Sequence, residues 1–330
     1  MKPKYLTKND KIYLVAPSFG CTTTPYKQRL NKSIENFKKL NMNLYYGENI
    51  FLNEGLVASN TKELRAKEIN DAFKSDASAV WSVGGGELMN QILPYVDFNI
   101  IKENPKWFVG FSDNTNLTYT ITTILDIETI YGTNAPGFYN YPFEYDSLDT
   151  WDMINGKLEF KGYKKWQYEK IKKTYPKYNF DKKTRITNIN FTKLSGRLIG
   201  GCLDCLVGLC GTKFDNTINY INKHKDEGII FFLEACDLNP VGVIRALEQL
   251  KNAGWFNNIK GFIIGRSMHY YEKMFDLDMK KAYLSVLKDL NVPILLNVDL
   301  GHLAPSMPIR CGALATVEYK NSNVFITYKE

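Results

Sequence analysis

The fold is decided by the stretch Lys106-Trp107-Phe108-Val109-Gly110-Phe111-Ser112-Asp113-Asn114-Thr115. An apolar run from Trp107 to Phe111 ends on a serine, and residues that cap helices follow directly. This order is typical of a buried strand that leads into a helix, because Ser, Asp, Asn and Thr accept hydrogen bonds from the first N–H groups of a helix. The serine would lie at the strand tip, beside N–H groups that can stabilise a negative charge. An ordinary strand-to-helix junction explains the same residues, so other motifs must decide.

A second apolar strand, residues 79–83, leads into three consecutive glycines, Gly84, Gly85 and Gly86. Consecutive glycines let the backbone approach a ligand closely and direct N–H groups toward it. The spacing is neither the dinucleotide fingerprint G-x-G-x-x-G nor a P-loop, since no Lys-Ser/Thr follows. The glycines therefore predict a close backbone approach without identifying the ligand.

Two further apolar strands lie in the second half of the chain. One, at 228–234, ends on Glu234, and the other, at 292–298, is followed by His302. Together with Ser112 these residues are the parts of a nucleophile, an orienting acid and a general base. The other histidines are His224, in a polar stretch that we expect at the surface, and His269, a second candidate base after a strand end.

These motifs resemble the LD-carboxypeptidase family, the S66 serine peptidases, which includes muropeptide LD-carboxypeptidases and microcin C immunity peptidases. The resemblance runs from Ile12 to Gly312. It implies Ser112 as nucleophile, His302 as general base and Glu234 as the partner of His302. It also implies an oxyanion hole from the backbone N–H groups of Asp113 and Gly86, with Gly85 at the substrate.

The chain departs from familiar patterns at two positions. Asn114 stands where the second glycine of G-x-S-x-G would be, which argues against the α/β-hydrolase superfamily. The LD-carboxypeptidase family often has Gly-Gly-Asn, whereas Gly200-Gly201 is followed here by Cys202. A substrate contact from that asparagine is therefore in doubt.

Composition favours a cytoplasmic enzyme. The 330 residues suffice for two domains, and no apolar run approaches the roughly 20 residues that span a bilayer. Residues 12–17 are too short for a signal-peptide core and are predicted to form the first strand. The six cysteines are scattered, and the C-x-x-C formed by Cys202 and Cys205 has no second pair or nearby histidine to complete a zinc site. We expect free thiols, no metal and no cofactor.

Basic residues are concentrated in residues 161–185, which contain ten basic and two acidic residues. The net charge of the whole chain is only +7. Aromatic residues, Trp166 among them, are interleaved with the basic ones. Single-stranded nucleic acid binds to such segments, but no basic groove is indicated elsewhere, so we expect no nucleic-acid partner. A solvated linker and a wall for an anionic, ring-bearing ligand remain alternatives.

The periodicity is that of an α/β protein. Strands at 11–16, 43–46, 78–83, 107–111 and 128–131 alternate with helices at 25–40, 61–74 and 114–126, which predicts a parallel, Rossmann-like sheet. We expect an N-terminal α/β domain over 1–150, a basic and aromatic linker or insertion over 151–190, and a smaller α/β domain over 191–330. The site is expected in the cleft between the domains.

These observations predict a metal-independent serine carboxypeptidase. Arg266 and Arg310 are candidates to bind the substrate's terminal carboxylate, although either could form a structural ion pair. The substrate is expected to be a peptidyl or aminoacyl nucleotide of the microcin C kind, with Trp166 stacking on the base. The alternatives are the L–D amide of a cell-wall tetrapeptide and, from another class, a non-catalytic two-domain binding protein. The family suggests a homodimer.

Overall fold

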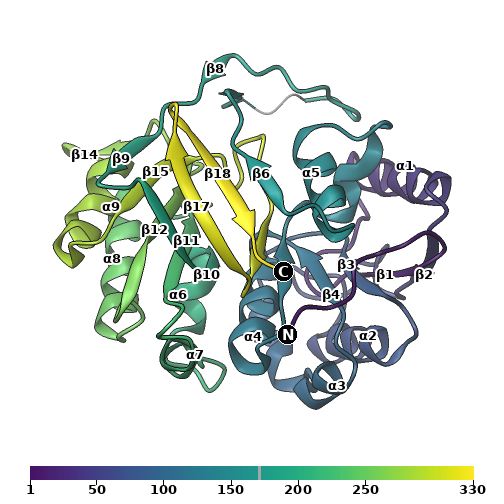
Figure 1. The fold of residues 1–330 in the computed structure, drawn as a ribbon. Coiled ribbons are helices and arrows are strands. Elements are labelled where there is room, and N and C mark those ends of the chain that lie inside the picture. Colours follow the sequence, from purple (N-terminus) through teal and green to yellow (C-terminus); the bar gives the residue numbers. More distant parts are fainter. Residues whose placement is uncertain (170–171) are drawn as a thin grey trace. The chain divides into compact units, whose positions relative to one another are not determined.

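The computed structural model describes residues 1–169 and 172–330, which divide into two compact units (Figure 1). The first comprises Met1–Lys157, residues 172–178 and Pro308–Arg310. The second comprises Leu158–Glu169, Asn179–Met307 and Cys311–Glu330. Each unit combines a sheet with helices, which confirms the predicted α/β class.

The first unit is built on a six-stranded sheet with the order β16-β5-β4-β3-β1-β2, and the paired strands from β1 to β5 are parallel. The strands are β1 (Lys11–Val15), β2 (Asn43–Tyr46), β3 (Ala79–Ser82), β4 (Trp107–Gly110), β5 (Thr129–Tyr131) and β16 (Ile309–Cys311). The helices are α1 (Tyr26–Lys39), α2 (Lys62–Lys74), α3 (Phe98–Glu103), α4 (Thr115–Leu125) and α5 (Tyr145–Ile154), with 3-10 turns η1 (Met89–Tyr95), η2 (Ser112–Asn114) and η3 (Ala135–Tyr139). Strands β3, β4 and β5 are buried throughout, as expected of the interior of a parallel sheet.

The second unit contains an eight-stranded sheet with the order β6-β18-β17-β10-β11-β12-β15-β9. Its parallel centre, β10-β11-β12-β15, is flanked by antiparallel strands. The strands are β6 (Glu159–Lys161), β9 (Thr187–Ile189), β10 (Lys193–Cys202), β11 (Ile229–Glu234), β12 (Ile259–Gly265), β15 (Ile294–Val298), β17 (Leu314–Lys320) and β18 (Asn323–Tyr328). The helices are α6 (Leu203–Leu209), α7 (Thr217–Lys223), α8 (Pro240–Asn252) and α9 (Met279–Leu287), with the 3-10 turn η4 (Lys288–Leu290).

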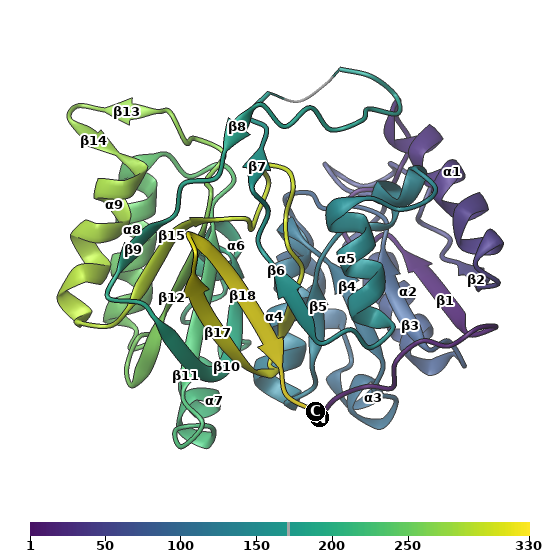
Figure 2. The same ribbon diagram turned by 45° about the horizontal axis from the view of Figure 1, so that its top comes forward.

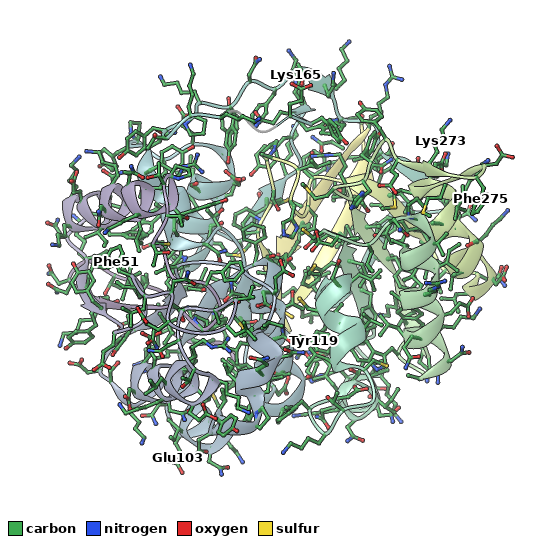
Figure 3. The ribbon with its side chains drawn as sticks, turned by 180° about the vertical axis from the view of Figure 1, so that it is seen from behind. Phe51, Glu103, Tyr119, Lys165, Lys273 and Phe275 are labelled. Atoms are coloured by element: carbon green, nitrogen blue, oxygen red, sulfur yellow. The ribbon has the colours of Figure 1, made fainter. Side chains whose placement is uncertain are left out.

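Two small hairpins complete this unit. Strands β7 (Lys165–Trp166) and β8 (Lys182–Lys183) pair within the basic segment. Strands β13 (Lys273–Met274) and β14 (Leu277–Asp278) form a second hairpin near α9 (Figure 2). Phe275 at its turn is exposed, and Figure 3 shows its side chain at the edge of the ribbon.

Local sequence explains where α8 begins. The Asn239 side chain accepts a hydrogen bond from the N–H of Gly242 at 2.9 Å, and Pro240 occupies the first position of α8. Proline is favoured there because its missing N–H would have no helical partner. The start of α8 therefore follows from its local sequence.

The basic segment is divided between the units. Residues 172–178 belong to the first unit, where Arg29 donates to the carbonyl oxygens of Lys173 and Thr174 at 2.8 and 2.6 Å. The Tyr178 hydroxyl donates to both carboxylate oxygens of Asp146. Lys170, one of the ten basic residues, lies outside the described residues. The described part of this segment is therefore anchored to folded structure.

None of the helices in the described part of the chain has the length and apolar character that a membrane crossing requires.

Candidate active site

Ser112 has a left-handed backbone conformation. It follows β4 and opens η2, and its φ is 66°. A residue with a Cβ rarely adopts this region, and strained positions of this kind gather at functional sites. The Ser112 N–H donates to the Tyr131 hydroxyl at 3.1 Å. The strand-to-helix turn predicted from the sequence is present, and Ser112 is its left-handed residue.

The side chain of Asn114 ties this turn to its neighbours. Its Nδ2 donates to the carbonyl oxygens of Gly84 at 2.9 Å and Phe111 at 3.0 Å, and to Asn134 Oδ1 at 3.3 Å. Asn134 Oδ1 also accepts the N–H of Phe111. One amide therefore joins the serine turn to the glycine run, and a glycine at position 114, as in G-x-S-x-G, could not do this.

Three glycines leave room that the turn needs. A Cβ on Gly110 would lie 2.7 Å from the Asn114 side chain, and one on Gly85 would lie 3.1 Å from the Ser112 hydroxyl oxygen. Gly86 has a φ of +155°, and a Cβ there would lie 2.1 Å from the hydroxyl oxygen of Ser18. The glycine run is thus packed against the serine turn, and Gly85 adjoins the Ser112 hydroxyl.

The Asp113 carboxylate is buried and serves as an anchor. It accepts hydrogen bonds from the Ser18 hydroxyl, from the N–H of Met89 at 2.8 Å and from Asn116 Nδ2 at 2.9 Å. Burial raises the pKa of Asp113, while these donors and the Arg65 charge act in the opposite direction. With the side chain held in this way, the oxyanion role implied for Asp113 rests on its backbone N–H.

Glu234 and His302 form a close pair within the second unit. Glu234 ends β11, His302 follows β15, and Glu234 Oε2 lies 2.8 Å from His302 Nδ1. Glu234 is fully buried and the His302 side chain is 12 % exposed. A carboxylate on Nδ1 fixes the ring orientation and leaves Nε2 to exchange a proton.

Two glycines lie beside Glu234. Gly301 has a φ of +103°, and a Cβ there would lie 2.8 Å from Glu234 Oε2. A Cβ on Gly265 would lie 2.2 Å from the backbone oxygen of Leu300 and 3.1 Å from the Cβ of Glu234. The glycine before His302 is therefore required both by its backbone conformation and by the carboxylate beside it.

The electrostatics of this pair raise the pKa of His302. Burial acts to lower the pKa of His302, but the negative charge of Glu234 and hydrogen bonds to Glu234 and Cys236 act against it. The net effect raises the pKa of His302 well above its usual value of 6.5. The pair can accept and hold a proton.

The two arginines proposed for the substrate carboxylate make buried ion pairs. Arg266 Nη2 lies 2.6 Å from Asp299 Oδ1, and both side chains are buried. Arg310 donates to Glu128 Oε2 from Nη2 at 2.6 Å and from Nε at 3.0 Å. Its Nη1 donates to the Tyr5 hydroxyl. This geometry favours the structural alternative for both residues.

Trp166 is only 2 % exposed and belongs to an aromatic cluster formed by Trp166, Tyr168, Tyr270 and Tyr271. The Arg266 guanidinium lies 4.9 Å from its ring centroid. Tyr271, whose ring is nearly parallel to that of Trp166, is 56 % exposed. In this cluster the exposed ring of Tyr271 is thus stacked with the buried ring of Trp166.

Two domain models account for most of the chain. The LD-carboxypeptidase N-terminal domain of peptidase family S66 matches residues 12–132, and the corresponding C-terminal domain matches residues 195–317.

The chain belongs to the LD-carboxypeptidase family. It is an S66 serine carboxypeptidase-like hydrolase.

Similar proteins represent both branches of this family. The microcin C7 self-immunity protein MccF of Escherichia coli is 27 % identical, covering 98 % of this chain and 94 % of its own. A probable murein peptide carboxypeptidase of Bacillus subtilis is 24 % identical, covering 96 % and 91 %. The solved structure of MccF with aspartyl sulfamoyl adenosine has a TM-score of 0.83 and 24 % identity, covering 100 % of this chain and 99 % of that one.

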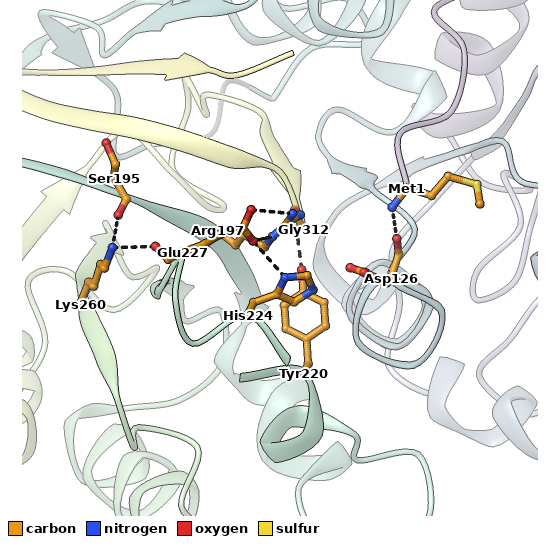
Figure 4. Close-up of polar contacts among 9 residues, drawn as sticks. All are labelled: Met1, Asp126, Ser195, Arg197, Tyr220, His224, Glu227, Lys260 and Gly312. Carbon is orange, nitrogen blue, oxygen red and sulfur yellow. Dashed lines mark hydrogen bonds and ion pairs between the residues drawn. The ribbon is translucent and has the colours of Figure 1, made fainter. Parts of the chain in front are cut away.

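The other two histidines of this chain, His224 and His269, each contact a glutamate other than Glu234. His224 was expected to be solvated, and this was wrong. It is 8 % exposed, its Nδ1 lies 3.0 Å from Glu227 Oε2, and its ring packs on Tyr220 (Figure 4). The contacts with Tyr220 and with the Glu227 carboxylate accompany the burial of His224 within a polar stretch of sequence. His269, the second candidate base, pairs with Glu272.

None of the six cysteines, all of which lie within the described residues, forms a disulfide bond, and Cys21, Cys202 and Cys311 are buried. Burial raises the pKa of Cys21 to about 12. Within residues 1–169 and 172–330, no cluster of three or more His, Cys, Asp or Glu residues could hold a metal ion.

Sequence reasoning missed the residues that hold the site together. Ser18, Asn134 and Tyr131 lie far from Ser112 in sequence, and nothing in their own neighbourhoods marks them. Asn114 offered a signal, because a side-chain amide directly after a strand tip can bond to several loops. In the sequence, Asn114 indicates a helix start and argues against G-x-S-x-G. Its side chain caps neither η2 nor α4.

We predict that Glu234→Gln lowers the pKa of His302. The variant removes the charge that opposes the effect of burial, so the imidazole should lose its proton at lower pH than in the wild type. In the wild type, the raised pKa stabilises the fold below about pH 6.5, and this contribution is lost as the pH rises through the folded-state pKa. An NMR titration of the three imidazoles measures the change, with His224 and His269 as internal controls. An unchanged His302 titration would contradict the assigned electrostatics.

Proposed function

We propose that this chain is a serine carboxypeptidase in which Ser112 is the nucleophile, His302 the general base and Glu234 the residue that orients His302. The observation that carries the proposal is the left-handed Ser112 at the end of β4, packed against Gly85. The Glu234–His302 hydrogen bond at 2.8 Å supports it. Since Ser112 belongs to the first unit and the other two residues to the second, the proposal requires the hydroxyl and the imidazole to meet in the working enzyme.

The chemistry follows from these roles. The Ser112 oxygen attacks the carbonyl carbon before the terminal residue while His302 Nε2 takes the hydroxyl proton. The carbonyl oxygen becomes negatively charged, and the backbone N–H groups of Asp113 and Gly86 are proposed to stabilise it. His302 then protonates the leaving amine, and water hydrolyses the acyl-enzyme by the same steps.

The proposed substrate is a peptidyl or aminoacyl nucleotide whose hydrolysis gives self-immunity of the microcin C kind. Support comes from the 27 % identity to MccF and from the aspartyl sulfamoyl adenosine bound in a solved MccF structure. The positive charge of residues 161–185 suits an anionic ligand. Because Trp166 is buried, a base can stack on it only if a neighbouring ring such as Tyr271 moves aside.

Removal of the terminal D-amino acid from a muropeptide tetrapeptide is the alternative. The similarity to the probable murein peptide carboxypeptidase favours it, and so does the buried, structural environment of Trp166. A non-catalytic binding protein of the same fold would bind its ligand equally well after Ser112→Ala and would form no adduct. We further propose a cytoplasmic homodimer, as the family suggests.

Kinetics of single and double variants test the proposed triad. Ser112→Ala and His302→Ala should each lower kcat by at least about 10³-fold, and the double variant should be little worse than either, because the two residues act as a unit. Glu234→Gln should cost less. His269→Ala is the matched control and should retain activity. Losses that add in the double variant, or a larger loss in His269→Ala, would show that the assignment is wrong.

A comparison of two substrates tests the role of Trp166. Trp166→Ala should raise KM for an aminoacyl sulfamoyl adenosine on the order of 10-fold, because base–aromatic stacking contributes about 1–3 kcal/mol. A muropeptide tetrapeptide has no base, so its hydrolysis reports any structural damage, and Trp166→Phe retains a ring for packing. Equal effects on both substrates, or none on either, would contradict the nucleobase role and favour the muropeptide branch.

A further inference from the structure

A carboxylate outside the proposed triad controls the turn that follows Glu234. Asp204 lies in the first turn of α6, directly after β10. Its Oδ2 accepts the N–H of Cys236 at 3.0 Å, and its Oδ1 accepts those of Asp237 at 2.9 Å and Leu238 at 3.1 Å. Three consecutive backbone donors are thus bound by one side chain, two to four residues beyond Glu234.

A fourth donor reaches the same carboxylate from β10. The Cys202 thiol lies 3.3 Å from Asp204 Oδ2. Cys202 is also the residue that stands opposite Glu234 where β10 and β11 pair. A carboxylate can accept about four hydrogen bonds, and no neutral side chain of this size matches that. Asp204 therefore joins the carboxyl ends of β10 and β11 at the point where Glu234 leaves the sheet.

The turn that Asp204 holds carries two groups that act on His302. Glu234 precedes it and contacts His302 Nδ1, and Cys236 lies within the turn. Both raise the pKa of His302. A shift of the turn would move both groups relative to the ring.

We propose that Asp204 is a positioning residue for the Glu234–His302 pair: by binding the N–H groups of residues 236–238, it keeps Glu234 against His302 Nδ1. Asp204 acts through the turn and touches neither the imidazole nor the reacting atoms. Its importance for hydrolysis rests on the proposed function, whereas its effect on the imidazole does not.

Asp204→Asn in the full chain tests this inference without substrate. The amide has nearly the same shape, but it presents one acceptor oxygen and an NH₂ group to three N–H donors and a thiol. The NMR titration of His302 should therefore move to lower pH, in the direction of Glu234→Gln. Asp204→Glu keeps the charge but displaces the carboxylate by one methylene group, so it should give a smaller shift in the same direction. This variant serves if Asp204→Asn does not fold.

Asp215→Asn is the matched control. Asp215 lies in the same unit and accepts the N–H groups of Gly211 at 2.9 Å and Thr217 at 3.1 Å, as well as the indole N–H of Trp255. None of these donors lies on the strands or turns that carry Glu234 and His302. Asp215→Asn should lower the unfolding midpoint and leave the His302 titration unchanged. Folded Asp204 variants with an unchanged His302 titration, or an equal shift in Asp215→Asn, would overturn the inference.

Kinetic measurements distinguish a failure of this inference from a failure of the proposed function. If His302 is the base, kcat/KM rises with pH through its pKa, so Asp204→Asn should move that rise to lower pH. Misplacement of the pair should lower kcat on the order of 10- to 100-fold with KM nearly unchanged. A shifted titration in Asp204→Asn with no hydrolysis by the wild type would support the role of Asp204 and contradict the proposed function.

Discussion

The left-handed backbone of Ser112 is the constraint on which the first unit's site depends. Such a conformation costs about 1–3 kcal/mol for a residue with a side chain, so the surroundings must hold it in place. Here the Asn114 amide, the Tyr131 hydroxyl and the space left by Gly85 do so. Under the proposed function, this conformation places the Ser112 hydroxyl at the start of a helix, beside backbone N–H groups that stabilise an oxyanion.

In the second unit, a different set of residues holds Glu234 and His302 in place. Its parallel strands β11 and β15 bring Glu234 and His302 to one edge of the sheet, and Gly301 makes room for the buried carboxylate. Each unit has an aspartate that accepts hydrogen bonds from backbone N–H groups near a proposed catalytic residue. This aspartate is Asp113 in the first unit and Asp204 in the second. Polar side chains that fix backbone turns, rather than apolar packing alone, thus define both halves of the proposed site.

The sequence predicted the elements whose signals are local. The strands that end at Gly110 and Glu234 were apolar runs with polar ends, and Asn239 with Pro240 is a helix start readable from neighbouring residues. The sequence did not predict contacts between residues that are distant along the chain: β16 joins the first sheet from position 309. Asp299 and Glu128, the partners of Arg266 and Arg310, are also distant in sequence. From the sequence, an ion pair was therefore only one of two alternatives for each arginine. The burial of His224 was missed although Tyr220 and Glu227 lie only four and three residues away, because the surrounding sequence is polar.

The central claim is that Ser112 is a nucleophile activated by His302, and covalent labelling tests it most directly. Intact and peptide mass spectrometry after incubation with a fluorophosphonate should show one adduct, on Ser112, in the wild type. The adduct should be absent in Ser112→Ala and form much more slowly in His302→Ala, because the imidazole no longer takes the hydroxyl proton. Labelling of another residue, or equal labelling of Ser112 without His302, would contradict the account.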